Sequence, residues 1–430
     1  MPMSTARKPP LIDHFADLED PRIDRTKDHP LINVLFIAIC AVISGAEGWT
    51  DMETFGESKR KWLAQFLDLS NGTPSDDTFR RVISRLDPTA FEDRFRRWTA
   101  AVGRRIEQED SKNEGSGSSS EAGVVALDGK TLRGSADRDK STLAREGTSR
   151  EGTSKAPLHL VSAWASDKRL VLAQERVEEK TNEINALPEV LDALDLLALY
   201  LEDSLVTIDA IGTQKDIARQ IQNQGGDYVL ALKSNHPRLY GDVKGFFADA
   251  VDRGLLGNRG LLGMGPDQTR EVDGGHGRVE VRQCWATGDW VTGDVEWLDD
   301  RDKWPSLSSL AMVEARRSES TWDEEAEQWT WKETTERRYY ISSLSPSAER
   351  IGKAVRSHWG IENQVHWVLD VSFQEDSSRI RKGNAPENVG LLRRIAMNAL
   401  RQMEDRKSLK ARRKKAGWDE RYLEKILGFR

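Results

Sequence analysis

The feature that most constrains the fold is a succession of strand and helix patterns between residues 124 and 232. The predicted elements are, in order, strands at 124–128, 158–165 and 169–177, a helix at 184–199, a strand at 204–208, a helix at 214–222 and a strand at 228–232. Such a series buries its apolar faces when the strands form one mixed sheet and the helices cover it. The sequence therefore predicts an α/β fold.

Length and charge limit what this chain can do. Its 430 residues exceed what one hydrophobic core usually serves, so we expect two or three domains. The 64 basic and 71 acidic residues give a net charge of −7, so any DNA-binding surface must be a local patch. Two cysteines, Cys40 and Cys284, are too few for a disulfide scaffold or a cysteine-rich zinc module.

No segment indicates a membrane partner. The longest apolar run, from Leu31 to Ala46, is shorter than a bilayer-spanning helix and contains Asn33, so it predicts a buried helix. The residues before it are polar and charged, which is not typical of a signal peptide. We therefore expect a cytoplasmic protein without a membrane partner.

Changes in composition predict how the chain is organised. The predicted segments are a helical N-terminal domain (1–107), a flexible linker (108–122), the first part of an α/β core (123–232), a strand-rich insertion (233–340), the continued core (341–390) and a basic helical tail (391–430). The N-terminal domain is a candidate for DNA contact because it carries Arg80, Arg81, Arg85, Arg94, Arg96 and Arg97. The tail, with 13 basic and 5 acidic residues, favours a polyanion, and a solvated basic surface is the alternative.

Tryptophan is concentrated in the predicted insertion. Its members are Trp285, Trp290, Trp297, Trp304, Trp322, Trp329 and Trp331. We expect most of these side chains to pack in the core or at sheet edges, with base stacking as the alternative.

Two acids are predicted at the carboxyl ends of strands. Asp128 follows Val124 to Leu127, and Asp209 follows the strand that ends at Ile208. Ligands of open α/β sheets gather at this edge, so the two carboxylates can meet in one cleft. A turn or helix-capping role is the alternative for either acid.

A third polar group lies on a helix predicted to begin with Ser345 as its N-cap and Pro346 as its first residue. Four polar residues at intervals of four lie along one face of this predicted helix: His358, Glu362, His366 and Asp370. Converging carboxylates need divalent cations, and two Mg²⁺ or Mn²⁺ ions would support in-line phosphoryl transfer. A zinc site from His358, Glu362 and His366 is the alternative, but it leaves both aspartates without a role.

The acids and their surroundings resemble the DDE transposases of bacterial insertion sequences, specifically the ISAs-type group that includes the H-repeat-associated proteins. The matching stretches are Ala126-Leu-Asp-Gly-Lys-Thr131, Val206-Thr-Ile-Asp-Ala210, Asp227-Tyr-Val-Leu-Ala-Leu-Lys-Ser-Asn235, His358-Trp-Gly-Ile-Glu-Asn363, His366-Trp-Val-Leu-Asp370, Phe373-Gln-Glu-Asp376 and Arg379-Ile-Arg381. The stretches His29-Pro-Leu, Trp49-Thr-Asp and Pro74-Ser-Asp-Asp-Thr-Phe79 resemble the domain that accompanies these enzymes. The resemblance covers nearly the whole chain.

The resemblance implies a ribonuclease-H-like catalytic core, a mixed sheet with helices, interrupted by a β-rich insertion and preceded by a helical domain. It implies that Asp128, Asp209 and Glu362 are catalytic and bind two Mg²⁺ or Mn²⁺ ions. The implied reaction is cleavage at the ends of an insertion sequence, which releases a 3′-hydroxyl that then attacks target DNA. The implied partners are double-stranded DNA, as terminal inverted repeats and target, and a second copy of the chain on that DNA, at the bacterial nucleoid.

The sequence departs from the family pattern around the catalytic glutamate. Related transposases place a Tyr, an Arg and a Lys at fixed offsets that here hold Val355, His358 and Leu369. His358 is a candidate to replace the Arg, and His366, Arg379 or Arg381 to supply the missing cation. The candidate DNA contacts are Lys130, Lys233, Asn235, His358, Asn363, His366, Arg379 and Arg381.

Three alternatives stay open at the level of sequence. The chain could be a domesticated, inactive DNA-binding protein, or a metal-dependent nuclease without strand transfer. The third metal ligand could also be Asp370, Glu375 or Asp376 in place of Glu362.

Overall fold

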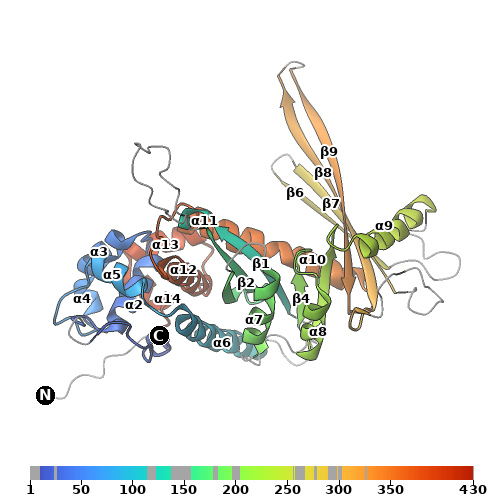
Figure 1. The fold of residues 1–430 in the computed structure, drawn as a ribbon. Helices are drawn as coiled ribbons and strands as arrows, with labels where there is room; N and C mark the ends of the chain where they lie inside the picture. The colour runs from blue at the N-terminus through green and yellow to red at the C-terminus, as the bar shows by residue number, and fades with distance from the viewer. Residues whose placement is uncertain are drawn as a thin grey trace, which may run out of the picture. The chain divides into compact units, whose positions relative to one another are not determined.

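The computed structural model describes residues 10–23, 27–113, 123–136, 156–177, 183–195, 204–254, 256, 267–275, 278–288, 298, 303–324 and 327–429. Internal contacts divide the chain into two compact units. The first unit comprises residues 1–119, 129–186 and 362–430, and the second unit comprises residues 120–128 and 187–361. Figure 1 shows the elements of both units.

The elements of the first unit are mainly helical. They are α1 (Pro10–Asp13), α2 (Leu31–Ile43), α3 (Trp49–Ser58), α4 (Arg60–Leu63), α5 (Asp76–Ile83), α6 (Pro88–Asn113), a 3₁₀ turn (Arg133–Ser135), β2 (Leu158–Ala165), β3 (Leu170–Val177), α11 (Trp367–Phe373), α12 (Ala385–Arg401), α13 (Leu409–Trp418) and α14 (Glu420–Ile426). Strand β1 (Val124–Leu132) and helix α7 (Glu183–Asp195) pass from one unit into the other.

The second unit contains most of the sheet. Its elements are β4 (Leu205–Ile208), α8 (Lys215–Asn223), β5 (Asp227–Leu232), α9 (Pro237–Asp252), β6 (Asp267–Gly275), β7 (Arg278–Thr287), β8 (Ser309–Asp323), β9 (Gln328–Ser342) and α10 (Ala348–Gly360). A π-helical turn (Ile361–His366) joins α10 to α11.

Helix α12 is the centre of the first unit. It packs on α2, α6 and β3. Helix α2 is buried on all sides, as its apolar sequence predicts, and its Asn33 donates a hydrogen bond to the carbonyl of Asp68 at 2.6 Å. On β3, the amide N–H of Val171 donates to Oδ1 of Asn398 at 3.0 Å, and Nδ2 of Asn398 donates to the Val171 carbonyl at 2.8 Å. The side chain of Asn398 thus satisfies backbone groups at the edge of the sheet.

The strand order confirms the mixed α/β arrangement expected from the sequence. In the first unit the order is β3-β2-β1, and β2 and β3 are antiparallel. In the second unit the order is β1-β4-β5-β9-β8-β7-β6. There β1, β4 and β5 are parallel, whereas β5 and β9, and then each neighbouring pair out to β6, are antiparallel.

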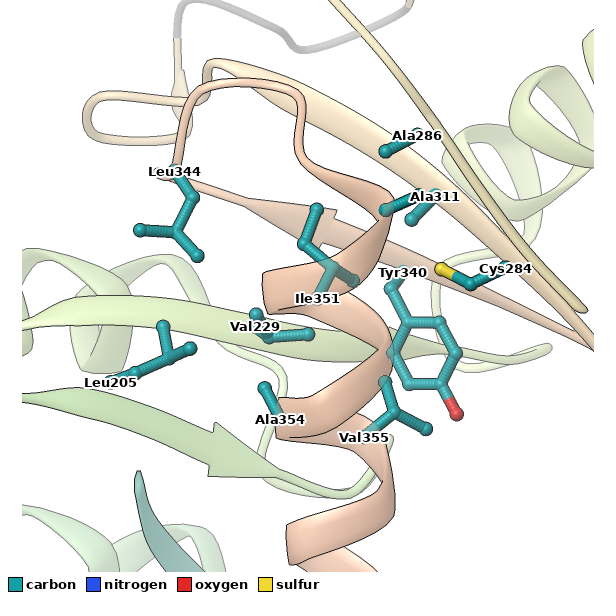
Figure 2. Packing of buried hydrophobic residues seen from close by; sticks show 11 residues of the cluster. Leu205, Val229, Cys284, Ala286, Ala311, Tyr340, Leu344, Ile351, Ala354 and Val355 are labelled. Carbon is teal, nitrogen blue, oxygen red and sulfur yellow. The ribbon is translucent and has the colours of Figure 1, made fainter. Parts of the chain in front are cut away.

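Helix α10 covers one face of the sheet in the second unit. Its buried side chains Ile351 and Ala354 belong to one apolar cluster with Leu205 of β4, Val229 of β5 and Tyr340 of β9 (Figure 2). This packing fixes α10 along the strands that carry the predicted acids. It therefore determines which strand residues face the helix.

The structure corrects the predicted start of this helix. Ser347, not Ser345, is the N-cap, and its side chain accepts a hydrogen bond from the N–H of Arg350 at 3.3 Å. The N–H of Ala348 donates to Oδ2 of Asp267 at 2.9 Å. Two of the unpaired N–H groups of the first helical turn are thus satisfied when the helix begins at Ala348.

The structure also bears on the predictions for the linker, the tryptophans and a membrane-spanning helix. Residues 108–113, assigned to the linker, belong to α6, whereas residues 114–122 of that linker lie outside the described residues. Of the insertion's tryptophans, Trp285 and Trp304 are buried as expected, Trp322, Trp329 and Trp331 are exposed, and Trp290 and Trp297 lie outside the described residues. Over the part of the chain that the structure describes, no helix is long and apolar enough to cross a bilayer.

Candidate active site

Asp128 and Asp209 occupy matching positions on neighbouring parallel strands. Leu127 of β1 is paired with Ile208 of β4, so the next residue on each strand is one of the two acids. Asp209 directly follows β4, two positions after Thr207, whose hydroxyl contacts α10. Asp128 likewise directly follows the last residue of β1 that is paired with β4. Neighbouring strands lie about 4.8 Å apart, so the register places the two residues side by side.

Strand β1 does not end at Asp128, which corrects the sequence prediction. The strand continues to Leu132, and both Lys130 and Leu132 remain buried, so the alternation of faces persists. Asp128 stands where the pairing with β4 ends, inside a continuing strand. The turn role considered for a strand-terminal acid therefore does not apply to Asp128.

Asp209 does have the turn role that was the alternative for it. Its Oδ1 accepts hydrogen bonds from the N–H of Ile211 at 3.0 Å and of Gly212 at 3.4 Å. The hydroxyl of Thr213 contacts both the Asp209 carbonyl, at 3.2 Å, and the Ala231 carbonyl, at 2.7 Å. These bonds hold the segment after β4 against the end of β5, so the backbone that presents the Asp209 carboxylate is fixed.

Asn235 and Lys233, two predicted DNA contacts, follow β5. The amide of Asn235 donates to the carbonyl of Ala210, the residue after Asp209. Asn235 therefore stabilises the Asp209 turn, a positioning role that the sequence did not indicate. The side chain of Lys233 is exposed at the end of the third parallel strand.

Thr207 is a site residue that the sequence analysis missed. Its side chain is buried, and its Oγ1 lies 3.1 Å from Nδ1 of His358 on α10. The contact orients the imidazole of His358 two strand residues before Asp209. A buried threonine in an apolar strand requires a polar partner, and that requirement was the available signal in the sequence.

The helix that carries Glu362 changes its period at that residue. A π-helical turn closes i→i+5 hydrogen bonds in place of i→i+4 bonds, and such turns occur frequently at functional sites. The stripe predicted from a spacing of four, His358, Glu362, His366 and Asp370, is therefore interrupted between Ile361 and His366. The residue one turn beyond Glu362 shifts from His366 toward Trp367, whose side chain is 59% exposed. Glu362 is itself exposed.

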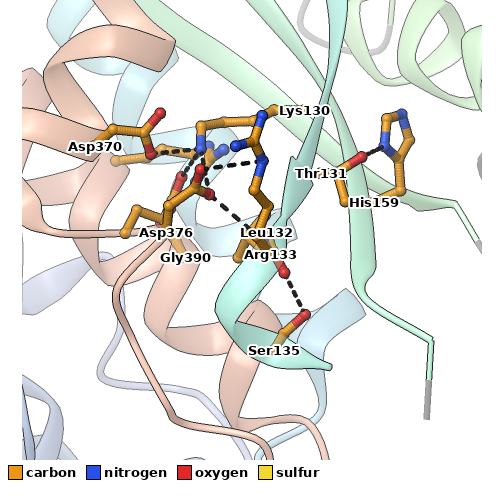
Figure 3. A network of polar contacts seen from close by, with 11 residues as sticks. Lys130, Thr131, Leu132, Arg133, Ser135, His159, Asp370, Asp376 and Gly390 are labelled. Atoms are coloured by element: carbon orange, nitrogen blue, oxygen red, sulfur yellow. Dashed lines mark hydrogen bonds and ion pairs between the residues drawn. The ribbon is translucent and has the colours of Figure 1, made fainter. Parts of the chain in front are cut away.

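Lys130 is the centre of a buried ion cluster in the first unit (Figure 3). Its Nζ lies 2.6 Å from Oδ1 of Asp370, 3.1 Å from Oδ1 of Asp376 and 3.6 Å from Oε2 of Glu375. Arg394 donates from Nη1 to Oε1 of Glu375 at 3.0 Å, and neither side chain of that pair is exposed. Three carboxylates thus share two buried cations.

The neighbouring basic side chains change the pKa values of the carboxyl groups in this cluster. Burial alone would raise the pKa of Glu375, but Arg394, Arg393 and Lys130 together lower that pKa below its usual value. Burial raises the pKa of Asp370, and Lys130 partly offsets the rise. These acids already have counter-charges, which disfavours them as the third metal ligand. The side chain of Lys130, a predicted DNA contact, is 7% exposed, and its ammonium is paired with these carboxylates.

The remaining candidate DNA contacts are distributed over the first unit. Arg381 donates from Nε to the carbonyl of Gly134 at 3.1 Å, so it holds the end of β1. Arg379 and Asn363 are exposed, and His366 is half-buried. In the N-terminal region, ion pairs with acids involve Arg80, Arg81, Arg94, Arg96 and Arg97. Such pairing reduces the positive charge that this surface offers to DNA.

The candidate metal ligands in the second unit are the carboxylate oxygens of Asp128 and Asp209. Among the residues with described positions, no group of three or more His, Cys, Asp and Glu side chains could hold a metal ion. The adjacent carboxylates of Asp128 and Asp209 are nevertheless the hard ligands that Mg²⁺ and Mn²⁺ prefer. Two such neighbouring charges repel each other, and a divalent cation would relieve that repulsion. The pair therefore fits such an ion.

Two domain families match this chain. Residues 119–399 match the transposase DDE domain, and residues 12–99 match the domain described as DDE_Tnp_1-associated. The chain therefore belongs to the DDE transposase family.

Several bacterial relatives are similar over almost their full length. "Putative transposase YncI" of Escherichia coli O157:H7 is 36% identical over 97% of this chain and 94% of its own. "H repeat-associated putative transposase YhhI" of E. coli K12 is 36% identical over 97% of each chain. A shorter relative, "Inactive transposase YbfQ" of E. coli K12, is 46% identical over 17% of this chain and 88% of its own.

Among solved structures, piggyBac transposase in a synaptic complex with hairpin DNA aligns with 97% of this chain and 78% of its own, at 10% identity. The TM-score is 0.36, a level that does not establish a shared fold.

Proposed function

We propose that this chain is a metal-dependent DNA transposase that cuts the ends of its own element and joins them to target DNA. The observation that carries the proposal is the register of β1 and β4, which makes Asp128 and Asp209 neighbours in a member of the DDE transposase family. The substrate is double-stranded DNA, and paired element ends favour a homodimer on that DNA.

The proposed catalytic core is ribonuclease-H-like. It comprises β3, β2, β1, β4 and β5, with β1 common to the strand runs of both units. Strands β6 to β9 and helix α9 form the β-rich insertion between β5 and α10. This arrangement supports the family expectation for the order of the acids, with Asp128 on the first strand, Asp209 after the fourth and Glu362 after the insertion.

Asp128, Asp209 and Glu362 are the proposed ligands of two Mg²⁺ or Mn²⁺ ions. Glu362 follows His358 by four residues, about 6 Å along a helix, and Asp209 follows Thr207 by two residues, about 6.6 Å along a strand. Thr207 contacts His358, and Asp209 and Glu362 follow these two residues closely in the sequence. This short separation along the chain supports Glu362 as the third ligand. Bound ions would stabilise the charge that develops on the scissile phosphate.

The surrounding residues orient the site and the DNA. Thr207 fixes the ring of His358, a candidate contact to the scissile strand. Asn235 and Thr213 hold the turn that presents Asp209. Lys233 lies exposed at the end of β5, where its ammonium can pair with a phosphate. Asn363, His366 and Arg379 remain candidate contacts.

The test is cleavage of labelled duplexes that carry the flanking ends of the chain's own element, in Mg²⁺, Mn²⁺ or EDTA. The variant is Asp209→Asn, because an asparagine oxygen can still accept the bonds from Ile211 and Gly212 while one charge is lost. Asp216→Asn, an exposed acid on α8, is the matched control. We expect metal-dependent nicking by the wild type and Asp216→Asn, and none by Asp209→Asn.

The fate of the 3′-hydroxyl separates the rival functions. Joining of that hydroxyl to a second duplex would establish transposition. Nicking without joining would identify a nuclease, and equal DNA binding by wild type and Asp209→Asn without cleavage in any metal would identify an inactive DNA-binding protein.

A further inference from the structure

The end of the β8–β9 hairpin carries three exposed tryptophans. The side chains of Trp322, Trp329 and Trp331 are 50%, 65% and 62% exposed. Strand β7 pairs with β8 only as far as Glu319, so beyond that residue β8 and β9 pair only with each other (Figure 1). The end of this hairpin, residues 320–324 and 327–331, is called the hairpin tip below. Its indoles contribute to no core, and clustered exposed aromatic rings mark an interaction surface.

The three indoles lie on one face of the hairpin tip. Trp322 is directly opposite Trp329, and their rings meet edge to face with centroids 5.7 Å apart. Trp331 is opposite Ser320, two residues along the same strands, so it points the same way. The face is therefore a continuous aromatic surface presented to a partner.

The charge of the hairpin tip argues against DNA as that partner. The tip residues include three acids, Asp323, Glu324 and Glu327, and no basic residue. Stacking sites for nucleic acid combine aromatic rings with a positively charged groove along the backbone. The acids of the hairpin tip repel phosphates, so these indoles fit a partner that carries positive charge and apolar surface together.

This chain has a surface of that composition on α13. Residues 406–415 contain seven basic side chains and no acidic one. A spacing of four places Lys410, Lys414 and Trp418 on one face of the helix. Both lysines are exposed, and the side chain of Trp418 is 79% exposed. Lysines at this spacing can pair with acids and lie over indole rings, while Trp418 adds a matching aromatic contact.

We propose that the hairpin tip of one copy of the chain docks on α13 of a second copy. Acidic and basic side chains meet at the rim of this contact, and the four tryptophans form its centre. A twofold-symmetric dimer makes the contact twice, and this repetition is what allows two small patches to approach the roughly 1,200 Å² that stable interfaces bury. Docking requires neither DNA nor metal, so it is separable from the proposed catalytic activity.

The test is sedimentation velocity of the full chain without DNA or metal. The tip variant is Trp329→Ser/Trp331→Ser and the tail variant is Lys410→Glu/Lys414→Glu. The controls are Trp367→Ser and Lys382→Glu, exposed residues outside both patches, and circular dichroism checks the fold of every variant. We expect a wild-type dimer whose dissociation constant rises at least tenfold in either patch variant and on raising NaCl from 0.1 to 0.5 M, and is unchanged in the controls.

A mixture of the two patch variants gives the decisive result. Neither variant can form the contact with itself, but a heterodimer joins the intact tip of one to the intact tail of the other. We therefore expect stronger association in the mixture than in either variant alone. A monomeric wild type, a mixture that gains nothing, or tip variants that lose duplex DNA binding without any change in sedimentation would each overturn the proposal.

Discussion

Two groups of carboxylates, one in each unit, differ in how their charge is arranged. In the second unit, Asp128 and Asp209 stand at matching register on adjacent strands, and backbone N–H groups hold Oδ1 of Asp209. In the first unit, Asp370, Glu375 and Asp376 surround the ammonium of Lys130. The difference teaches that carboxylates enclosing a fixed cation stabilise a fold, whereas like charges placed side by side are suited to an exchangeable divalent ion.

The largest expected effect separates Glu362 from Asp370 as the third ligand. Glu362→Gln should lower single-turnover cleavage by about a thousandfold or more, the scale seen when a group acting in the transition state is removed. Asp370→Asn should keep cleavage within about tenfold, because its carboxylate serves Lys130. An inactive but folded Asp370→Asn, together with an active Glu362→Gln, would reverse this assignment.

Removing the central cation tests the structural role of the cluster in the first unit. Lys130→Met removes the ammonium that is paired with the carboxylates of Asp370, Glu375 and Asp376. The free energy of unfolding should therefore fall by about 3–5 kcal/mol. Urea denaturation measures the change. Lys353→Met, which breaks an exposed pair with Glu349, is the matched control and should cost about 0.5 kcal/mol or less. Equal effects in the two variants would mean that the cluster is not a stabilising unit.

A third buried carboxylate sharpens the contrast with Glu375. Burial raises the pKa of Glu92 to about 7, and the bonds from Arg96 and from the N–H of Gln174 offset the rise only in part. A raised pKa in the folded state means that stability is full below pH 4.5 and is lost as the pH rises through 7. The expected loss is about 3 kcal/mol.

Thermal melts from pH 4 to 8 measure this dependence. Glu92→Gln removes the titrating group, so the stability of this variant should not show the loss of about 3 kcal/mol between pH 4.5 and 7. A Glu92→Gln profile that matches the wild type would show that another group is responsible.

The smallest effect concerns the backbone around Lys130. A Cβ at Gly134 would overlap the carbonyl oxygen of Ser378 and lie 2.8 Å from that of Asp376. Gly134→Ala should therefore lower stability by about 1–3 kcal/mol. Gly241, on α9, has nothing within 4 Å of its Cβ position, so Gly241→Ala should raise stability by about 0.5–1 kcal/mol. A neutral Gly134→Ala, measured in the same denaturation series, would contradict this close packing.

The sequence predicted the strand and helix order of the core because alternating and helical patterns report directly on burial. It could not predict that β1 continues past Asp128, because the burial of Lys130 depends on carboxylates about 240 residues further along the chain. The π-helical turn at Glu362 was likewise hidden, since a spacing of four residues reads as a regular helix.

Side-chain partners set a similar limit on the candidate site. Asn235 was predicted as a DNA contact, and the sequence did not show that its amide donates to Ala210, a bond between two loops that only the sheet brings together. Thr207 was missed because its partner, His358, lies 151 residues away. Long-range contacts of this kind require the tertiary structure.

The central claim is that the acids on adjacent strands, and not those around Lys130, hold the metal. The most direct measurement is a Mn²⁺ titration, followed by electron paramagnetic resonance, of wild type, Asp128→Asn/Asp209→Asn and Asp376→Asn with the element-end duplex present. The account predicts equal affinity for wild type and Asp376→Asn and at least a tenfold loss in the double variant. Loss of Mn²⁺ binding in Asp376→Asn, with binding retained in the double variant, would contradict it.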